Sequence, residues 1–511
     1  MADQMVRLYL TRFESVFRIL HIPSFWNEYE RYWSDPTEAE TVLQLKIQLV
    51  TAIGTSIIRQ DTVDTTDIYS TARQGLYATQ EWLSGPMKKN RISIDSLQVQ
   101  CLLILARQAL AAGGDIVWIS MGTVVRTAMQ MGLHRDPKHF TRMGILQGEI
   151  RRRLWATILE LNVQAALDAG VPPTLSFDDF DTEAPSNVND QDMDEQTKAL
   201  QEHPPTAATD SSLQRFLFRS LRPRLEVARR MNGLTSRPSE MSMSYNELIA
   251  LTASLTSTCR SCDAHIPRTH SASSDMASFH HNLADLLLRR FILHLHRPLA
   301  GRARTDPRYY FSRKTSLDAA LAILSPIPKN AEFAHLVLLG AGIFKHRMIH
   351  ASLAVASELL MEVEEHRPVG FHSPSQEPSG YRKMLMEALR EALRQAAERI
   401  RLGETNVKLH MKLRMALRQT EVAGENSSSL QQLAESAKES LETSYAMIQE
   451  RATSEGVEIN NESGRDRGMS ADFDLDDFDP ESFTLGSNFN FNLDDLFFLP
   501  AEFDMDGVAA P

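Results

Sequence analysis

Two cysteines and two histidines near the middle of the chain have the most obvious potential for chemistry. Cys259 and Cys262 enclose two residues, and His265 and His270 follow shortly after them. Thiolates and imidazoles at such spacing bind zinc, but a structural zinc site needs four converging ligands and this pattern is a single half-site at the end of a predicted helix. We therefore expect no metal to bind here.

Two further histidine patterns could suggest chemistry. His294 and His296 are two positions apart, so in a regular helix they point to different faces and cannot converge on one ion. His134 precedes Arg135 and Asp136, a combination compatible with acid–base catalysis but also with an Arg–Asp clamp at a helix end. The chain has no glycine-rich phosphate loop and no nucleophile elbow. We expect no catalytic residues and no bound cofactor, and hence no enzyme.

Helices must position these residues, because apolar side chains recur every three or four positions from Tyr9 to about Ala452 with hardly any alternation. This spacing predicts an all-α fold with many helices. The predicted helices span residues 5–20, 24–34, 40–59, 66–84, 93–112, 115–132, 147–169, 211–231, 243–263, 275–296, 313–325, 331–365, 379–401, 405–420 and 427–452. Long breaks rich in proline, serine or acidic residues separate them at 169–205, 267–274 and 366–378.

The composition excludes several classes of protein. The 511 residues include 42% hydrophobic residues, enough for one large or two medium cores, and only three cysteines, which rules out a disulfide framework. Neither a secretory signal nor a run of apolar residues long enough to cross a membrane is present. Short basic clusters at 151–153, 229–230 and 289–290 lie inside helical patterns, and we interpret them as solvated helix faces.

The last 43 residues, Met469–Pro511, differ from the rest in charge and aromatic content. They hold eleven acidic residues and eight phenylalanines without a lysine or arginine, whereas the remaining chain is nearly neutral with 54 basic and 55 acidic residues. A segment that alternates acids with large apolar groups cannot bury a core, so it stays open and exposes its aromatic side chains to a partner. A tail that serves only solubility is the alternative, but it would have no reason to expose phenylalanines. We predict a disordered acidic activation tail with apolar anchors at Phe473, Phe478, Leu493, Leu496, Phe497 and Phe498.

Three sequence blocks surround the predicted turn at Leu133–Asp136. A helical segment that begins near Trp118 stops at Gly132, because glycine adopts the left-handed conformation of a helix end. The second block, Glu-Ile-Arg-Arg-Arg-Leu-Trp at 149–155, opens another helix, and the third, Asp-Ala-Gly-Val-Pro-Pro-Thr at 168–174, follows its far end.

In order and spacing these blocks closely resemble the central regulatory domain, or middle homology region, of fungal zinc-cluster transcription regulators. The opening segment at 17–25, with its His-Ile-Pro-Ser-Phe turn, and the helix at 286–298 add to the resemblance, which covers roughly residues 8–420. It implies a regulatory domain at 1–420, a final helix and flexible linker at 421–468, and the activation tail at 469–511. The motif residues that it marks are Gly132, Leu133, His134, Arg135, Asp136, Arg152, Trp155, Gly170 and Pro172.

The sequence departs from the family pattern in the zinc cluster that binds DNA, because the cysteines for it are missing. That cluster requires six closely spaced cysteines, and this chain has three in all. Either the protein is a family member without this cluster, or the chain begins downstream of it. Zinc is expected only in the second case. Direct DNA contact from this chain is not expected.

The resemblance and the tail together predict a nuclear transcription regulator, an activator of a pathway-specific gene set such as that of a secondary-metabolite cluster. Its expected partners are coactivators or the general transcription machinery, together with a homodimer or a heterodimer with a zinc-cluster regulator. A second hypothesis is a co-regulator or inhibitor that pairs with a DNA-binding relative. A third is a helical ligand-binding protein or enzyme, which a deep cavity with perturbed titratable groups would favour.

Overall fold

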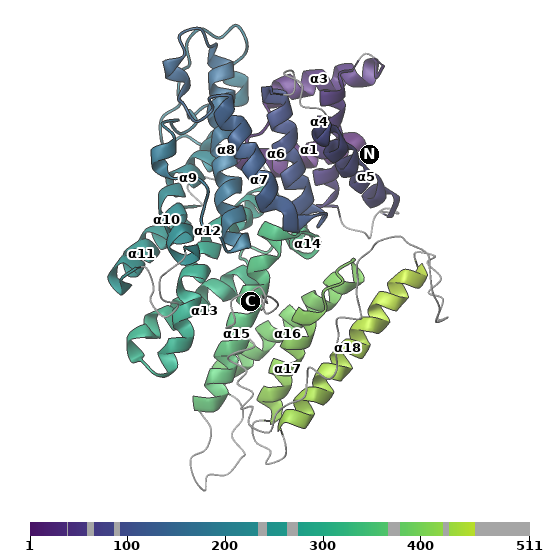
Figure 1. Cartoon of the computed structure of the whole chain (residues 1–511), viewed down its shortest axis with the longest axis vertical. Helices are drawn as coiled ribbons and strands as arrows, with labels where there is room; N and C mark the ends of the chain where they lie inside the picture. The colour runs from purple at the N-terminus through teal and green to yellow at the C-terminus, as the bar shows by residue number, and fades with distance from the viewer. Residues whose placement is uncertain are drawn as a thin grey trace, which may run out of the picture. The chain divides into compact units, whose positions relative to one another are not determined.

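The computed structural model describes residues 1–37, 39–58, 66–85, 92–233, 243–262, 274–365, 379–422 and 429–454. These residues form α-helices and short 3-10 helices without a strand, which confirms the predicted all-α fold (Figure 1). The chain divides into two compact units, Met1–Val355 and Ala356–Pro511. The activation tail predicted at 469–511 lies outside the described residues.

The helices of the first unit are α1 (Ala2–Arg12), α2 (Glu14–Phe17), α3 (Ile22–Ser34), α4 (Thr41–Thr55), α5 (Thr66–Ser84), α6 (Ile94–Ala109), α7 (Val117–Gln130), α8 (Ile145–Ala169), α9 (Ser212–Arg219), α10 (Leu221–Asn232), α11 (Tyr245–Ser261), α12 (Ser274–Ala300), α13 (Tyr310–Leu324) and α14 (Ala331–Leu339). Helix α15 (His346–Glu365) contains the division between the units, and α16 (Gly380–Arg401), α17 (Lys408–Val422) and α18 (Ser429–Ser454) belong to the second.

Two long helices, α8 and α12, organise the first unit. On one side of α8 lie α7 and then α6, which in turn contacts α4 and α5. On its other side α8 packs against α9 and α10, and α10 leads to α12, which contacts α11 and α13 (Figure 1). Because neighbours surround α8, even its polar side chains are largely buried, and each needs a partner inside the fold.

A proline splits one predicted helix. The pattern predicted a single helix over 211–231, but the structure has α9 and α10 on either side of Ser220. Pro223 has no N–H to donate to the carbonyl of Arg219, and its ring crowds the preceding turn, so the helix breaks just before it. The prediction of continuity was wrong here because proline's effect outweighs apolar spacing.

A glutamine from another helix splits a second predicted helix, at 331–365. In the structure α14 ends at Leu339, and Gly342 adopts φ +50° before α15 begins. The buried Gln108 of α6 stabilises this break with two hydrogen bonds. Its backbone carbonyl accepts from the N–H of Ala341 at 2.7 Å, and its side-chain oxygen accepts from the N–H of Ile343 at 3.1 Å. A side chain at Gly342 would collide with Gln108, since a Cβ there would lie 2.9 Å from the same oxygen.

The N-terminal prediction, a helix over 5–20, was also too long. Helix α1 ends at Arg12, α2 follows as one short turn, and Arg18 takes a left-handed φ of 36°. Arg18 is only 2% exposed, so the irregular backbone here directs the guanidinium of Arg18 into the interior.

The second unit contains a bundle of α16, α17 and α18. Serines at 436, 440 and 444 form a buried stripe along α18, spaced four residues apart so that they share one face. His410 of α17 lies against this stripe, with its Nδ1 2.7 Å from Ser440 Oγ. Small side chains at these positions let the helices approach closely.

None of the helices in the described ranges is both long enough and apolar enough to span a membrane.

Candidate functional site

The end of α7 forms the turn that the sequence motif predicts. Gly132 has φ +76°, and the N–H of Leu133 reaches back to the carbonyl of Ala128 at 2.9 Å. Leu133 is fully buried, so the turn is anchored in the core by an apolar side chain. The carbonyl of Leu133 also accepts from the Thr182 hydroxyl at 2.7 Å, which joins the turn to the long loop after α8.

Asp136 is the centre of this turn. Its fully buried carboxylate accepts from Arg152 of α8 twice, at 2.8 and 3.0 Å, and from the backbone N–H groups of Lys138 at 2.9 Å and Glu183 at 3.0 Å. Burial alone would raise the pKa of the Asp136 carboxyl, but these hydrogen bonds, the Arg152 pair foremost, hold the pKa well below its usual range. Asp136 therefore stays ionised, and it connects α7, α8 and the loop at 181–183.

Arg135 lies on the outer side of the same turn. Its Nε is 3.3 Å from Asp181, and His139 Nε2 is 3.0 Å from the same carboxylate. Asp181 also accepts from the backbone N–H of Asp136 at 2.8 Å. Both Arg135 and Asp181 are about half exposed, so this pair contributes little stability compared with the buried Asp136 pair.

His134 and Trp155 lie close together behind the turn. Their ring centroids are 6.4 Å apart, and the indole of the fully buried Trp155 meets Phe180 edge-on at 5.8 Å. No hydrogen-bond partner is present for His134 Nδ1 in the described structure. The arrangement is that of an aromatic cluster which holds the loop against α8.

Gly170 and Pro172 mark the other end of α8. Gly170 takes φ +65° and ends the helix, and Pro172 is exposed just beyond it. The side-chain amide of Asn232 donates to the carbonyls of Ala166 at 3.1 Å and Val171 at 3.0 Å, which ties this end of α8 to α10. The structure thus places the motif residues at the two ends of one helix.

Buried arginines are the feature that sequence reasoning missed. The cluster at 151–153 was interpreted as a solvated face, but Arg153 is 1% exposed and donates to Asp190 at 2.6 Å, to Ser211 at 3.1 Å and to Glu149 at 3.3 Å. Arg18 pairs with the same Asp190 carboxylate. Consecutive helical residues point about 100° apart, so three adjacent arginines cannot share one face, and this signal in the sequence was available.

A second buried network follows α8 toward its C-terminal end. Glu160 accepts from Arg224 at 2.6 and 2.7 Å, and Arg290 of α12 pairs with Asp168. Arg290 is fully buried, so the interpretation of the cluster at 289–290 as a solvated face was wrong for this residue as well. Burial of so many ion pairs fixes which residues of α8 face which neighbour.

The described residues contain no group of three metal-ligating side chains that could hold an ion. Cys259 and Cys262 are buried, and burial raises the pKa of the Cys259 thiol to about 12, while His265 and His270 lie outside the described residues. His294 contacts Asn232 and Arg347. His296 lies between hydroxyl groups of Thr252 and Ser312 instead, so the two histidines diverge as expected.

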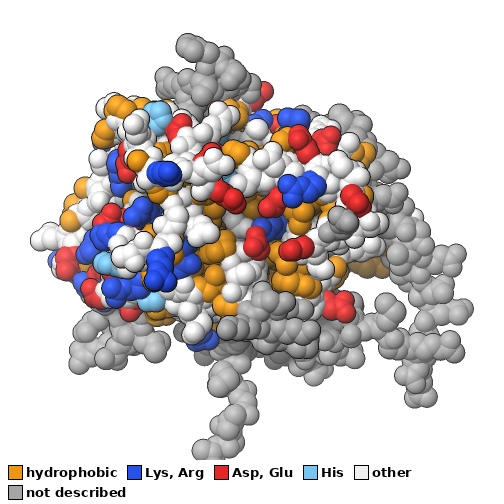
Figure 2. Space-filling model, turned by 90° about the horizontal axis from the view of Figure 1, so that it is seen from above, with side chains coloured by type: hydrophobic (Ala, Val, Ile, Leu, Met, Phe, Trp, Pro, Cys, Tyr) orange, Lys and Arg blue, Asp and Glu red, His pale blue; other side chains and the backbone are white. Residues whose placement is uncertain are grey.

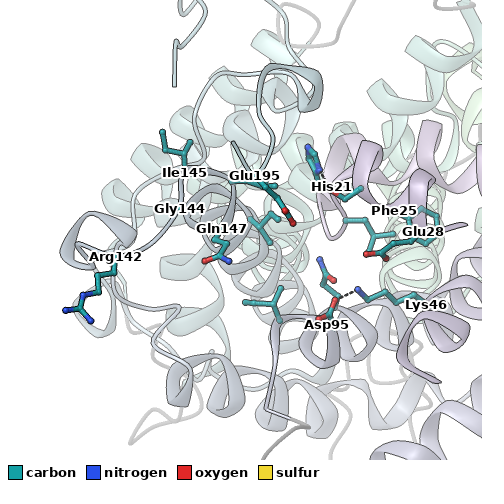
Figure 3. A pocket seen from close by; sticks show the side chains of 16 residues that line it. His21, Phe25, Glu28, Lys46, Asp95, Arg142, Gly144, Ile145, Gln147 and Glu195 are labelled. Atoms are coloured by element: carbon teal, nitrogen blue, oxygen red, sulfur yellow. Dashed lines mark hydrogen bonds and ion pairs between the residues drawn. The ribbon is translucent and has the colours of Figure 1, made fainter. Parts of the chain in front are cut away.

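Figure 3 shows a polar cavity of about 520 Å³ between α3, α4, α6 and the start of α8. On its wall Lys46 pairs with Asp95 at 2.5 Å, and Arg142 at its edge points away. Burial lowers the pKa of His21 on its wall to about 4, so this imidazole is neutral at neutral pH and is held by Ser24 and the Asp190 carbonyl. These side chains are engaged in the fold.

Comparison with known protein families identifies the domain that contains this turn. A family model described as the fungal specific transcription factor domain matches residues 6–287, more than half of the chain and including every motif residue named above. The chain belongs to this family. The resemblance seen in the sequence is thereby confirmed, and the turn around Asp136 is part of its regulatory domain.

The chain is also similar to curated transcription factors. The chain is 37% identical to the transcription factor asR3 of Sarocladium schorii over 82% of its own length and 52% of that protein. It is 34% identical to the transcription factor opdR of Penicillium oxalicum over 99% of its length and 65% of that protein. It is 34% identical to the aspyridones cluster regulator apdR of Emericella nidulans over 67% of its own length and 48% of that protein. The chain therefore spans about half to two thirds of these relatives, and no solved structure matches it.

Figure 2 shows one face of the molecule, where lysine and arginine side chains gather toward one side with acidic side chains among them. This mixture agrees with the nearly neutral charge of the chain outside the tail. The predicted tail anchors, Phe473, Phe478, Leu493, Leu496, Phe497 and Phe498, lie outside the described residues, so their role stays a prediction.

Proposed function

We propose that the protein is a nuclear regulator of transcription that activates a pathway-specific set of genes, namely those of a secondary-metabolite cluster. The match of the regulatory domain over 6–287 carries this proposal. It is supported by relatives named as transcription factors, one of them as the regulator of the aspyridones cluster. In this function the protein works by recruitment and not by catalysis.

The acidic tail is the part that we propose to recruit coactivators or the general transcription machinery. Leu493, Leu496, Phe497 and Phe498 surround Asp494 and Asp495, and helical spacing would gather Leu493, Leu496 and Phe497 on one side. Such a segment would fold onto a hydrophobic groove of its partner, while its acids keep it soluble when it is free.

A reporter assay tests the tail. Residues 469–511 are fused to an unrelated DNA-binding domain, and reporter transcription is compared between the natural tail and a variant with Leu493, Leu496, Phe497 and Phe498 changed to Ala. We expect the natural tail to activate and the variant to lose most of that activity. A tail that activates nothing, or that activates equally well without the four anchors, would contradict the proposal.

The matched control changes four apolar residues outside this segment, Phe483, Leu485, Phe489 and Phe503, to Ala. It removes a similar amount of apolar surface and should retain most of the activity. An equal loss in both variants would show that total hydrophobicity acts, and not the proposed anchors.

The regulatory role is tested in the cell with the full chain. Overexpression of a fluorescently tagged protein should give nuclear fluorescence and raise the transcripts of a contiguous group of biosynthetic genes, measured by RNA sequencing. Fluorescence excluded from the nucleus, or transcripts that do not change, would contradict it.

A further inference from the structure

A second cavity, of about 260 Å³, lies between α5, α6 and α7 in the first unit. Its apolar wall includes Leu83, Leu103, Ile104 and Val124. Its polar wall carries hydroxyl groups, among them Ser120, Thr123 and Thr127 of α7, and the side chains of Gln100 and Arg107 from α6. The cavity thus combines an apolar body with a polar end, the composition typical of small-molecule sites.

Arg107 in this cavity is a buried cation without a carboxylate. It is 7% exposed, and its guanidinium donates to Ser120 at 3.1 Å and to Gln80 at 2.6 Å, both neutral groups. Among the described side chains no aspartate or glutamate forms an ion pair with it. Burial lowers the pKa of Arg107, and no neighbouring acid opposes this.

Three other buried arginines of the same unit have a carboxylate partner. Arg153, Arg224 and Arg290 are each at most 1% exposed, and each contacts a carboxylate. Buried charges in proteins are normally paired, because removing an ion from water without a counter-charge costs much free energy. Among the described residues, Arg107 therefore lacks the carboxylate partner that Arg153, Arg224 and Arg290 have, and it lies beside empty space. Arg347, 2% exposed, also has neutral partners, but these are two imidazoles and the carbonyl of Leu167.

Gln100 is the second unsatisfied group on the same wall. Its side-chain oxygen is buried and accepts no hydrogen bond from the described residues. A guanidinium retains unused donors after two hydrogen bonds, whereas this oxygen needs a donor. A molecule that satisfies both residues has an anionic group beside Arg107 and an O–H or N–H group beside Gln100.

We propose that this cavity binds a small carboxylic acid, whose carboxylate pairs with Arg107 and whose hydroxyl or N–H group donates to Gln100. A planar carboxylate matches the fork of donors on a guanidinium. A phosphate fits less well, because the described lining of the cavity holds one cation and has apolar walls. A nucleotide fits less well because the volume is below the range of about 300–1,000 Å³ typical of drug-sized ligands. The inference does not depend on the proposed function.

Calorimetry and thermal unfolding of the purified full chain test this site. The probes are butanoate, hexanoate, benzoate and 4-hydroxybenzoate, each compared with its neutral primary amide, together with inorganic phosphate. We expect at least one acid to bind and to raise the melting temperature, with its amide about tenfold weaker or more, since the amide lacks the charge. We expect 4-hydroxybenzoate to bind more tightly than benzoate because only the former can donate to Gln100.

Arg107→Met is the decisive variant, and Arg126→Met, on the exposed face of α7, is its matched control. Arg107→Met should abolish acid binding and leave the melting temperature of the unliganded chain unchanged or higher, because it removes an uncompensated buried charge. Arg126→Met should bind as the natural chain does. Gln100→Leu should remove the preference for 4-hydroxybenzoate over benzoate.

Three results would overturn the proposal: no acid binds more tightly than its amide, phosphate alone binds, or Arg107→Met binds the acids unchanged. Should Arg107→Met fail to fold, Arg107→Lys decides instead. That variant keeps the charge but loses the fork of donors, so weaker binding supports the site and unchanged affinity refutes it.

Discussion

Asp136 at the end of α7 and Arg152 on α8 are joined by two hydrogen bonds, at 3.0 and 2.8 Å, and the carboxylate has no exposure to solvent. Both residues belong to motifs that the family resemblance marks. Their pairing accounts for the spacing of the two motif blocks in this chain, since the turn after α7 must bring its carboxylate to the second turn of α8.

Asp136→Asn tests this pair. The amide cannot compensate the Arg152 cation, whose side chain is only 20% exposed, so we expect a loss of about 3 kcal/mol in the free energy of unfolding. Urea unfolding followed by circular dichroism measures it. Asp178→Asn in the nearby exposed loop is the control and should change stability by less than about 0.5 kcal/mol. Equal effects of both variants would show that the pair does not hold the turn.

Asp190→Asn should be at least as damaging as Asp136→Asn. Asp190 is 2% exposed and serves both Arg18 and Arg153, so its neutralisation leaves two buried cations without a shared counter-charge. We expect a loss of roughly 3 to 5 kcal/mol or failure to fold, again by urea unfolding. Asp192→Asn, two residues further along the same 3-10 helix and one third exposed, is the comparison. A mild effect of Asp190→Asn would mean that the two arginines find other partners.

Two glycines of the α7 region should respond to alanine with opposite signs. Gly132→Ala forces a side chain into a left-handed conformation at φ +76° and should cost about 1 kcal/mol or more. Gly122→Ala lies within α7 with no atom within 4 Å of the added Cβ, and it should stabilise the protein by about 0.5 to 1 kcal/mol. Melting temperatures of the two variants check this. A shared sign would refute the assigned role of Gly132 as the helix end.

His296 should make the protein sensitive to mild acid. Burial lowers the pKa of this fully buried imidazole to about 4, whereas in the unfolded chain the pKa is about 6.5. Between these values the unfolded chain takes up a proton that the folded chain does not, so stability falls as the pH falls from about 7 to about 4. From pH 7 to pH 5 this histidine accounts for about 2 kcal/mol.

His296→Gln isolates that contribution. Other buried histidines, such as His280, titrate in the same range, so the comparison is the difference between the two proteins in unfolding free energy at pH 7 and at pH 5. The variant should lose less stability on acidification than the natural chain. Parallel pH profiles would exclude His296 as a source of acid sensitivity.

The helical pattern predicted the fold class and most helices, because apolar spacing reports which face of a helix is buried. It failed where one local or distant residue outweighs the pattern. Pro223 broke one predicted helix by lacking an N–H, and Gln108 stabilised a break more than two hundred residues away in sequence, which no local pattern can show. At the candidate site, the ends of α7 and α8 could be predicted from Gly132 and Gly170.

The buried charges could not be foreseen in the same way. The i,i+4 spacing could have indicated Glu149 as a partner of Arg153, but nothing in the spacing points to Asp190. Nor does it tell that no acid among the described residues pairs with Arg107, because contacts between helices and loops distant in sequence decide this. The orientation of three adjacent arginines on α8 could have excluded a common solvated face, but only the fold shows which one of them turns inward.

The hydrogen bonds of Gln108 also set a limit on how the protein can be shortened. The family match ends at residue 287, inside α12, yet Gln108 holds the backbone at Ala341 and Ile343, and α13 packs along α12. A fragment trimmed to the family match would cut α12 in the middle and strip Gln108 of both partners. A fragment intended for crystallisation should therefore extend at least past residue 344.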